Sequence, residues 1–384
     1  MRVLISSTYF YPYSSGLSVY ALRLAEGLAE RGHEVVVLTS QYEKLLPSLE
    51  TKDGFRIVRV PVTTRLSKGV LMPRLHKIAR QWIAWADVVN LHLPQFESLL
   101  LSKIAQGFGK PVLVTYHCDL VMTGSLLNRL AGMVTSTIGQ QVVKDANLVV
   151  QNSLDYAEHS PILRKYLEKV IAVPTPVKVK SVSADRVEAF RKKYGIQKTD
   201  KVIGLAGRVA SEKGYEYLAI ALPTVLGVCP EARVVHAGAW DGVVGERAYR
   251  DQVEKFIQPF GEKWHSLGFL SDEDFETFFA AIDVLVFSSL NATESYGIVQ
   301  IEAMTQGTPV VASDLPGVRQ PVKNTGLGKI VPLRNPGAIS KAILEIFNQG
   351  EKARFVPTEF LEKFSQNAVA RHYEELFFLL VNND

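Results

Sequence analysis

Residues 284–312 read VLVFSSLNATESYGIVQIEAMTQGTPVVA, and this stretch decides the expected fold. The apolar runs at 284–287 and 309–312 are typical of buried strands, and a helical pattern between them begins near Tyr296. A strand, a polar loop, a helix and a second strand in this order form a βαβ unit, whose strands are parallel. The polar loop then lies at the carboxyl end of a strand, where open α/β sheets bind their ligands.

The same alternation of apolar strands and helices extends outward over both halves of the chain. Short apolar runs without polar alternation predict parallel sheets that are covered on both faces. They occur at 3–5, 35–38, 87–91, 112–115, 147–150, 201–206 and 233–236.

The pattern breaks at residues 173–177, VPTPV, and a polar stretch follows that is typical of a linker. We therefore predict two doubly wound, Rossmann-like α/β domains, at 1–178 and 185–365. The apolar C-terminal helix, at about 366–384, is free to pack back on the first domain.

The bulk properties exclude several classes of protein. The chain has 384 residues, 47% hydrophobic and 21% charged, which suits two globular domains. Its net charge of +4 is compatible with an anionic small molecule and too small to indicate nucleic acid. Two cysteines, Cys118 and Cys229, exclude a disulfide framework and favour the cytoplasm. Residues 1–16 do not resemble a signal peptide, and no apolar run approaches a membrane span, so we expect a soluble protein, at most attached to a membrane surface.

The loop before the helix near Tyr296 has the features of an anion site. A helix N-terminus offers free N–H groups and a positive dipole end, so the backbone from Ser295 through Tyr296 and Gly297 to Ile298 suits a diphosphate. Glu302 follows Glu294 by eight positions, and a carboxylate accepts hydrogen bonds from the vicinal hydroxyls of a ribose. The alternative is that Ser295 caps the helix and Glu302 is merely solvated.

A second cluster, GRVASEKG, follows the first strand of the second domain. Gly207 begins it, and Arg208 and Lys213 are two cations five residues apart on a strand-to-helix loop. They suit phosphate oxygens, Arg208 through its planar fork and Lys213 as a point charge, and they would neutralise charge on a departing nucleoside diphosphate. The alternative is an ordinary charged surface loop.

In the first domain, His117 follows a strand, and a neutral imidazole there suits a sugar hydroxyl or a developing positive charge. If the strand continued, Asp119 would share its face. The first loop lacks the G-x-G-x-x-G fingerprint of dinucleotide enzymes, although Gly16 at a helix start allows a ligand to approach the backbone. Both His117 and Gly16 also fit purely structural roles.

A helix that starts at Pro73 carries Arg74, Lys77 and Arg80 beside an apolar stripe. Such basic amphipathic helices bind anionic lipid surfaces, so peripheral membrane contact near Arg74 is one interpretation. Packing of a surface helix on its own sheet is the other. The sequence shows no metal-ligand spacing and no Walker loop, so we expect neither a metal nor a bound cofactor.

Together the clusters resemble a known family. GRVASEKG and TESYGIVQIEAMTQGTPVVAS closely resemble the large family of retaining GT-B glycosyltransferases that carries two glutamates separated by seven residues. RGHEVVVLTS, ADVVNLHLP, TYHCD, DLPGVRQPV and NTGLGKIVP resemble further segments of it. The family's first loop often has two glycines where this chain has Ser15 and Gly16.

The resemblance implies a GT-B fold, in which two Rossmann-like domains face each other across a cleft, with the acceptor on the N-terminal domain and the donor on the C-terminal one. It implies transfer of a sugar from a nucleotide diphosphate-sugar, which is a co-substrate, to an acceptor hydroxyl with retention of configuration and no required metal. The acceptor is unknown, and a glycan, a lipid-linked molecule and a small molecule all fit.

The resemblance also implies roles for single residues. Arg208 and Lys213 would bind the diphosphate, Glu294 hydroxyls of the donor sugar and Glu302 the ribose. The backbone from Ser295 to Ile298 would bind phosphate. Gly16 would allow the leaving phosphate to approach the first loop, and His117 would contact the donor sugar.

Four other functions compete with transfer. The same fold hosts epimerases and phosphorylases, but no segment resembles a pyridoxal-phosphate lysine site. A catalytically idle sugar-nucleotide-binding or scaffold protein would be expected to lose Arg208, Lys213, Glu294 or Glu302, and all four are present. A dinucleotide oxidoreductase is disfavoured by the missing glycine fingerprint.

Overall fold

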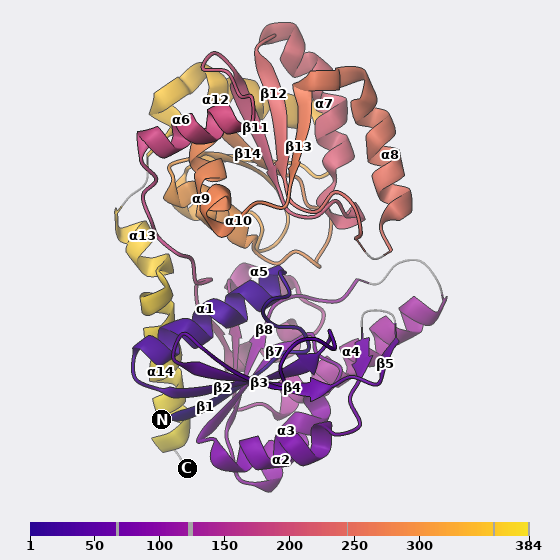
Figure 1. The fold of residues 1–384 in the computed structure, drawn as a ribbon, viewed down its shortest axis with the longest axis vertical. Coiled ribbons are helices and arrows are strands. Elements are labelled where there is room, and N and C mark those ends of the chain that lie inside the picture. The colour runs from indigo at the N-terminus through magenta and orange to yellow at the C-terminus, as the bar shows by residue number, and fades with distance from the viewer. Residues whose placement is uncertain (67–68, 122–125, 244, 356–357, 383–384) are drawn as a thin grey trace. The chain divides into compact units, whose positions relative to one another are not determined.

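The computed structural model describes residues 1–66, 69–121, 126–243, 245–355 and 358–382. The chain forms two compact units (Figure 1). Unit 1 comprises Met1–Val177 and Lys363–Asp384, and unit 2 comprises Lys178–Glu362. Helix α13 (Thr358–Phe364) spans one of the junctions.

Among the described residues, unit 1 contains strands β1 to β10. They are β1 (Arg2–Ser6), β2 (Glu34–Gln41), β3 (Leu49–Lys52), β4 (Phe55–Pro61), β5 (Thr64–Leu66), β6 (Gly69–Leu71), β7 (Val88–Leu93), β8 (Val112–Tyr116), β9 (Leu148–Gln151) and β10 (Val170–Ala172). Its helices and 3-10 turns are α1 (Gly16–Glu30), α2 (Leu75–Trp85), α3 (Ser98–Gly107), α4 (Leu126–Asp145), α5 (Leu154–His159), η1 (Leu163–Lys165), η2 (Leu167–Lys169) and α14 (Gln366–Asn382).

Unit 2 contains the remaining elements. Its strands are β11 (Lys201–Ala206), β12 (Ala232–Ala237), β13 (Trp264–Gly268), β14 (Val284–Phe287), β15 (Val310–Ser313) and β16 (Gly328–Val331). Its helices and 3-10 turns are α6 (Ala184–Lys193), η3 (Ser211–Lys213), α7 (Tyr215–Val228), α8 (Arg247–Ile257), η4 (Gln258–Lys263), α9 (Asp272–Ala281), α10 (Ile298–Thr305), α11 (Gln320–Thr325), α12 (Pro336–Gln349) and η5 (Gly350–Ala353).

The large sheet of unit 1 has the strand order β10-β9-β8-β7-β1-β2-β4-β3. All its pairs are parallel except β3 with β4, while β5 and β6 form a separate antiparallel hairpin. After β1 the chain adds β2, β4 and β3 toward one edge of the sheet. From β7 it adds β8, β9 and β10 toward the other edge. Right-handed crossovers then place helices on both faces, which is why β1 and β7 are buried along nearly their whole length.

The sheet of unit 2 is entirely parallel, with the order β13-β12-β11-β14-β15-β16. Helix α7 packs against α8 and α12, whereas α9 packs against α6 and α10. These two groups cover opposite faces, so the central strands β11 and β14 have buried side chains on both sides. The predicted parallel, doubly wound sheets are confirmed.

The last helix, α14, packs beside α1 in unit 1, although more than 300 residues separate them (Figure 1). The contact is close at Gly27, where an added Cβ would stand 2.9 Å from the Cβ of Ala370. The hydroxyls of Tyr20 and Tyr373 are 2.9 Å apart in the same interface. One face of the C-terminal helix, with Val369, Ala370, Tyr373 and Phe377, is thereby buried against α1 and β7.

Candidate functional site

The candidate site of unit 2 lies where its strand order reverses. Strands β11 and β14 are neighbours, and the chain leaves them toward opposite edges of the sheet. Ligands bind in doubly wound sheets at such a switch point, outside the carboxyl ends of the strands. The loop after β11 holds Gly207 to Gly214, and the loop after β14 holds Glu294 to Gly297, so the topology brings both predicted clusters to one place.

Hydrogen bonds tie these two loops together. The hydroxyl of Ser288 donates to the carbonyl of Lys213 at 2.9 Å, and the backbone N–H of Leu290 donates to the carbonyl of Glu212 at 2.8 Å. Gly214 has a φ of +63°, and an added Cβ would stand 2.6 Å from the carbonyl of Ser288. The close approach of the loops therefore requires glycine at this position.

The start of the first loop rests on a buried histidine that the sequence analysis did not single out. His236 Nε2 is 2.7 Å from the carbonyl of Gly207, and its Nδ1 is 3.1 Å from the hydroxyl of Ser266. Burial lowers the pKa of His236 to about 4, so the neutral ring donates from Nε2 to Gly207 and accepts from Ser266 at Nδ1. Its signal in the sequence was a polar residue near the end of an apolar strand.

Of the two predicted cations, Lys213 is brought to the second loop. Its Nζ lies 2.7 Å from Oε2 of Glu294, and these side chains are 16% and 19% exposed. The same Nζ lies 5.2 Å from the ring centroid of Phe287, the last residue of β14. Arg208 pairs instead with Glu212 in its own loop and is the more exposed of the two cations.

Helix α10 begins at Ile298, two residues later than the sequence pattern suggested. Gly297 is its N-cap, with a φ of +84°, and among the described residues no side chain caps this helix. The N–H groups of Ile298 and Val299 therefore remain available to an anion, whereas that of Gln300 donates to the carbonyl of Gly297. An added Cβ at Gly297 would stand 2.6 Å from the Phe287 ring. The ring of Phe287 therefore packs against both Lys213 and the start of the helix.

The remaining predicted donor residues lie along the same segment. Ser295 and Tyr296 are buried directly before the helix, and burial raises the pKa of Tyr296 well above its usual value. Glu302 lies in the second turn of α10 and is half-buried. The alternative that Ser295 caps the helix is wrong, because Gly297 occupies the cap position.

In unit 1 the first loop ends at the capped start of α1. The hydroxyl of Ser15 accepts from the backbone N–H of Ser18, and the Ser18 hydroxyl accepts from the N–H of Ser15. Gly16 is exposed and has nothing within 4 Å of the position of an added Cβ. Serine thus supplies the cap in this loop, and the space beside Gly16 is open.

His117 lies one residue beyond β8. Its Nε2 is 3.0 Å from Nδ1 of His92, and burial lowers the pKa of His117 to about 3. The condition under which Asp119 would share its face is not met, because the strand ends at Tyr116. The buried Asp119 carboxylate accepts from the hydroxyls of Tyr116 and Tyr156, at 2.7 and 2.9 Å, and thereby fixes the turn that carries His117.

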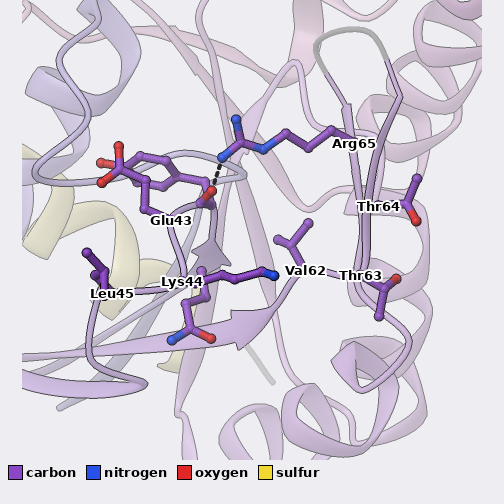
Figure 2. Close-up of a pocket in the computed structure, with 9 residues that line it drawn as sticks. Glu43, Lys44, Leu45, Val62, Thr63, Thr64 and Arg65 are labelled. Atoms are coloured by element: carbon purple, nitrogen blue, oxygen red, sulfur yellow. Dashed lines mark hydrogen bonds between the residues drawn. The ribbon is translucent and has the colours of Figure 1, made fainter.

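A pocket of about 430 Å³ opens beyond the carboxyl ends of β2 and β4 in unit 1. Figure 2 shows the loop with Glu43, Lys44 and Leu45 on one side and the segment from Val62 to Arg65 on the other. The Arg65 guanidinium donates to the carbonyl of Tyr42 and joins the two sides. The pocket offers cations, a carboxylate and two threonine hydroxyls.

Three tyrosines gather beside this pocket. Tyr9 stacks on Tyr13 with ring centroids 4.9 Å apart, and both rings meet Tyr42 edge-on at 5.8 and 5.5 Å. Burial, with a contribution from nearby Glu43, raises the pKa of Tyr42 to about 12. Sequence analysis missed this cluster, because only folding brings the first loop and the end of β2 together.

The basic helix α2 packs on its sheet through Leu75, Ala79 and Ile83. Arg74 stands at its N-cap, and Arg74, Lys77 and Arg80 are exposed. The helix therefore packs on its own sheet, although Ile78 and Trp82 of the predicted stripe are only half-buried, and its basic face remains open to solvent.

Among the described residues, no group of His, Cys, Asp and Glu side chains is arranged to hold a metal ion. No helix in the described part of the chain is long and apolar enough to cross a membrane.

Comparison with known proteins places both units in related families. Residues 186–369 match the family model described as "Glycosyl transferases group 1", and residues 15–165 match that of the "Glycosyl transferase 4-like domain". The chain is 24% identical over 379 residues to a phosphatidyl-myo-inositol mannosyltransferase of Mycobacterium leprae, covering 96% of this chain and 94% of that protein. It is 25% identical to a 2-deoxystreptamine N-acetyl-D-glucosaminyltransferase of Streptomyces fradiae, covering 88% and 84%.

Solved structures share the fold. A crystal structure of Anabaena HepE in complex with UDP matches with a TM-score of 0.77 and 19% identity, covering 99% of this chain and 100% of that one. Sucrose-phosphate synthase from Thermosynechococcus elongatus matches with a TM-score of 0.79 and 21% identity, covering 100% of both chains.

Proposed function

The chain belongs to the group 1 glycosyl transferases and is a nucleotide-sugar glycosyltransferase with the GT-B fold; on that premise we propose that unit 2 binds the donor and unit 1 the acceptor. The observation that carries the donor assignment is the convergence at the switch point of unit 2. There Lys213, Glu294 and the open N-terminus of α10 come from loops that are bonded to each other. A cation, a sugar-binding carboxylate and free N–H groups are the chemistry that a diphosphate-sugar requires.

Each donor residue has a distinct role in this proposal. Lys213 and Arg208 bind the diphosphate and neutralise the charge that grows on it as the glycosidic bond breaks. Lys213 is paired with Glu294. In this proposal Lys213 also binds the phosphates, and Glu294 accepts hydrogen bonds from hydroxyls of the sugar. The N–H groups from Ser295 to Ile298 hold phosphate, and Glu302 accepts from the ribose.

Unit 1 supplies the rest of the reaction in this proposal. Gly16 leaves room for the leaving phosphate, and the neutral His117 contacts the sugar being transferred. The pocket beside Tyr42 binds the acceptor in this proposal, and the acceptor carries a polyhydroxylated ring. Aromatic faces and threonine hydroxyls suit such rings. The relatives named above act, by their names, on acceptors of that kind, an inositol lipid and an aminocyclitol.

Whether that acceptor is attached to a lipid is a separate point. The exposed basic face of α2, with Arg74, supports a lipid-linked acceptor and peripheral contact with an anionic membrane. The chain as a whole is only mildly basic, so the proposal includes no nucleic acid partner.

A thermal-shift screen without metal tests the donor site. UDP, GDP, ADP, TDP and CDP and their sugar conjugates are added in turn, and a ligand that binds only the folded chain stabilises it by about 2.7 kcal/mol at 100 times its dissociation constant. We expect a shift with one nucleotide, abolished by Glu302→Ala and retained by Glu188→Ala, which removes an exposed glutamate of α6. No shift with any nucleotide would refute the donor site.

The idle-binder alternative is tested on the same samples. The donor that stabilises the chain is then incubated with it. A transferase should release the nucleoside diphosphate slowly when water accepts the sugar, and faster when the right acceptor is present. Binding with no release under any acceptor mixture would favour the idle binder.

A further inference from the structure

A buried chain of polar groups leads from β7 to His117 in unit 1. His92 Nδ1 is 3.0 Å from His117 Nε2, and His92 Nε2 is 2.9 Å from Oδ1 of Asn90. Asn90 and His92 are fully buried on one face of β7, in a strand whose other residues are apolar. Because buried polar groups cost free energy unless they are satisfied, every proton in this chain must have a definite place.

The direction of the chain is set by Asn90. Its Nδ2 donates to the carbonyl of Leu113 at 3.1 Å and to the hydroxyl of Thr115 at 2.9 Å. A backbone carbonyl only accepts hydrogen bonds, so the amide group cannot be turned around without placing two acceptors in contact. The Oδ1 of Asn90 therefore faces His92 and accepts from it.

This direction propagates through both imidazoles. Burial, reinforced by the neighbouring His117, holds the pKa of His92 well below its usual value, so the ring carries one proton, and that proton is on Nε2. The Nδ1 of His92 is then a lone pair and must accept from His117 Nε2–H. Since burial also lowers the pKa of His117 to about 3, His117 is neutral and its Nδ1 is a lone pair.

The ring of His117 is held in place by its surroundings as well. Tyr20 meets it edge-on, with ring centroids 5.0 Å apart and an interplanar angle of 84°. The following turn is fixed by the Asp119 carboxylate. Among the described residues Nδ1 of His117 has no partner, and the residue is partly exposed, so this lone pair is available to a ligand.

We propose that Asn90 and His92 are positioning residues, which hold His117 as the Nε2–H tautomer and so present its Nδ1 as an acceptor to a hydroxyl of the sugar being transferred. The proposal rests on the transferase function and names how His117 serves it. A lone pair and an uncharged ring suit the positive charge that develops at an anomeric carbon, whereas an N–H or an imidazolium would oppose that charge.

The proton positions are measured without any substrate. The full chain is labelled with ¹⁵N in its eight histidines, the signals of His92 and His117 are assigned by substitution, and the ring correlations are recorded from pH 8 to pH 5. We expect both rings to be neutral Nε2–H tautomers throughout. A protonated Nδ1 on His117 at pH 7 would overturn the proposal whatever the chain does to nucleotide sugars.

Two variants then separate positioning from packing. His92→Phe keeps an aromatic ring beside Tyr20, whose centroid is 6.0 Å from that of His92, but removes the acceptor for His117. Tyr373→Phe is the matched control, because it removes a buried hydroxyl 2.9 Å from Thr115 on the far side of Asn90. Both variants are first checked for folding by their melting temperatures.

In His92→Phe we expect His117 to give a mixture of tautomers and kcat/KM to fall about tenfold, the loss typical of one hydrogen bond. In Tyr373→Phe we expect the His117 signals to stay unchanged and kcat/KM to stay within about twofold of the wild type. Equal losses in the two variants, or an unchanged His117 spectrum in His92→Phe, would show that His92 only packs. A wild-type chain with the expected tautomers but no turnover would contradict the transferase function while leaving the tautomer assignment intact.

Discussion

Substituting Gly16 by alanine separates ligand approach from folding, because at this position the two depend on different atoms. Gly16 is the first residue of α1, it is exposed, and its φ does not lie in the left-handed region. No atom of the chain lies within 4 Å of an added Cβ. The new methyl group would therefore meet solvent in the free protein and would meet a ligand only if one approaches this loop.

The expected magnitudes follow from that geometry. Alanine is the better helix former by up to about 1 kcal/mol, so Gly16→Ala should leave the free energy of unfolding unchanged or raise it slightly. If the leaving phosphate packs against Gly16, the methyl group displaces it by about 1 Å, and displacements of that size cost on the order of 100-fold in rate. Stability and activity should thus move in opposite directions.

The assay pairs chemical unfolding with initial rates of nucleotide release from the donor identified by thermal shift. Gly139→Ala is the control, since Gly139 lies within α4 of the same unit and also has nothing within 4 Å of an added Cβ. It should gain stability, up to about 1 kcal/mol, and keep its activity. If Gly16→Ala is as active as Gly139→Ala, no ligand approaches this loop and the role proposed for Gly16 is refuted.

Three further predictions concern unit 2. Gly297→Ala should lower the free energy of unfolding by about 2–4 kcal/mol, from left-handed backbone strain and overlap with the Phe287 ring, and chemical denaturation measures this; a loss below about 1 kcal/mol would mean that the ring moves aside. Lys213→Ala should lower kcat/KM by about 10²–10³-fold through the lost charge on the diphosphate, and near-normal turnover would contradict its assignment. In the unfolded chain His236 becomes protonated below pH 6.5. In the folded chain its lowered pKa keeps it neutral down to about pH 4. Stability from this ring is therefore complete above pH 6.5 and falls by about 3 kcal/mol as the pH drops to 4, and urea unfolding at several pH values should show a weaker acid dependence in His236→Asn.

The alternating strands of both units were predictable because they are short apolar runs in an otherwise mixed sequence. The hairpin of β3 and β4 was not predicted, although Asp53 and Gly54 form its turn with φ values of +45° and +82°. An Asp-Gly pair is a strong hairpin signal, but its flanking residues, Thr51-Lys52 and Phe55-Arg56, do not form the apolar run that marks a buried strand. Edge strands with mixed patterns are harder to find from sequence than central ones.

In the candidate donor site, the segments were predictable and their pairing was not. Lys213 and Glu294 were both singled out, yet they are 81 residues apart, and their contact depends on β11 lying beside β14. The position of Asp119 depended on where the strand ends, which an apolar run alone does not fix. Because β8 ends at Tyr116, Asp119 is instead a buried acceptor for tyrosine hydroxyls.

The two units differ in how far their chemistry can be predicted, and the reason is physical. Phosphate binding uses backbone N–H groups and a few charges within one loop and one helix start, so its pattern is written in consecutive residues such as 294–298. The tyrosine cluster and the Asn90–His92–His117 chain are assembled from the ends of different strands, and their registers decide the contacts. His92 faces Thr115 across the β7–β8 pair, two residues before His117, and no local pattern encodes that distance. In the proposed function, recognition by unit 1 therefore depends on these cross-strand contacts: substitution of Tyr42 should change which acceptors are used, and substitution of His92 should change the rate of sugar transfer.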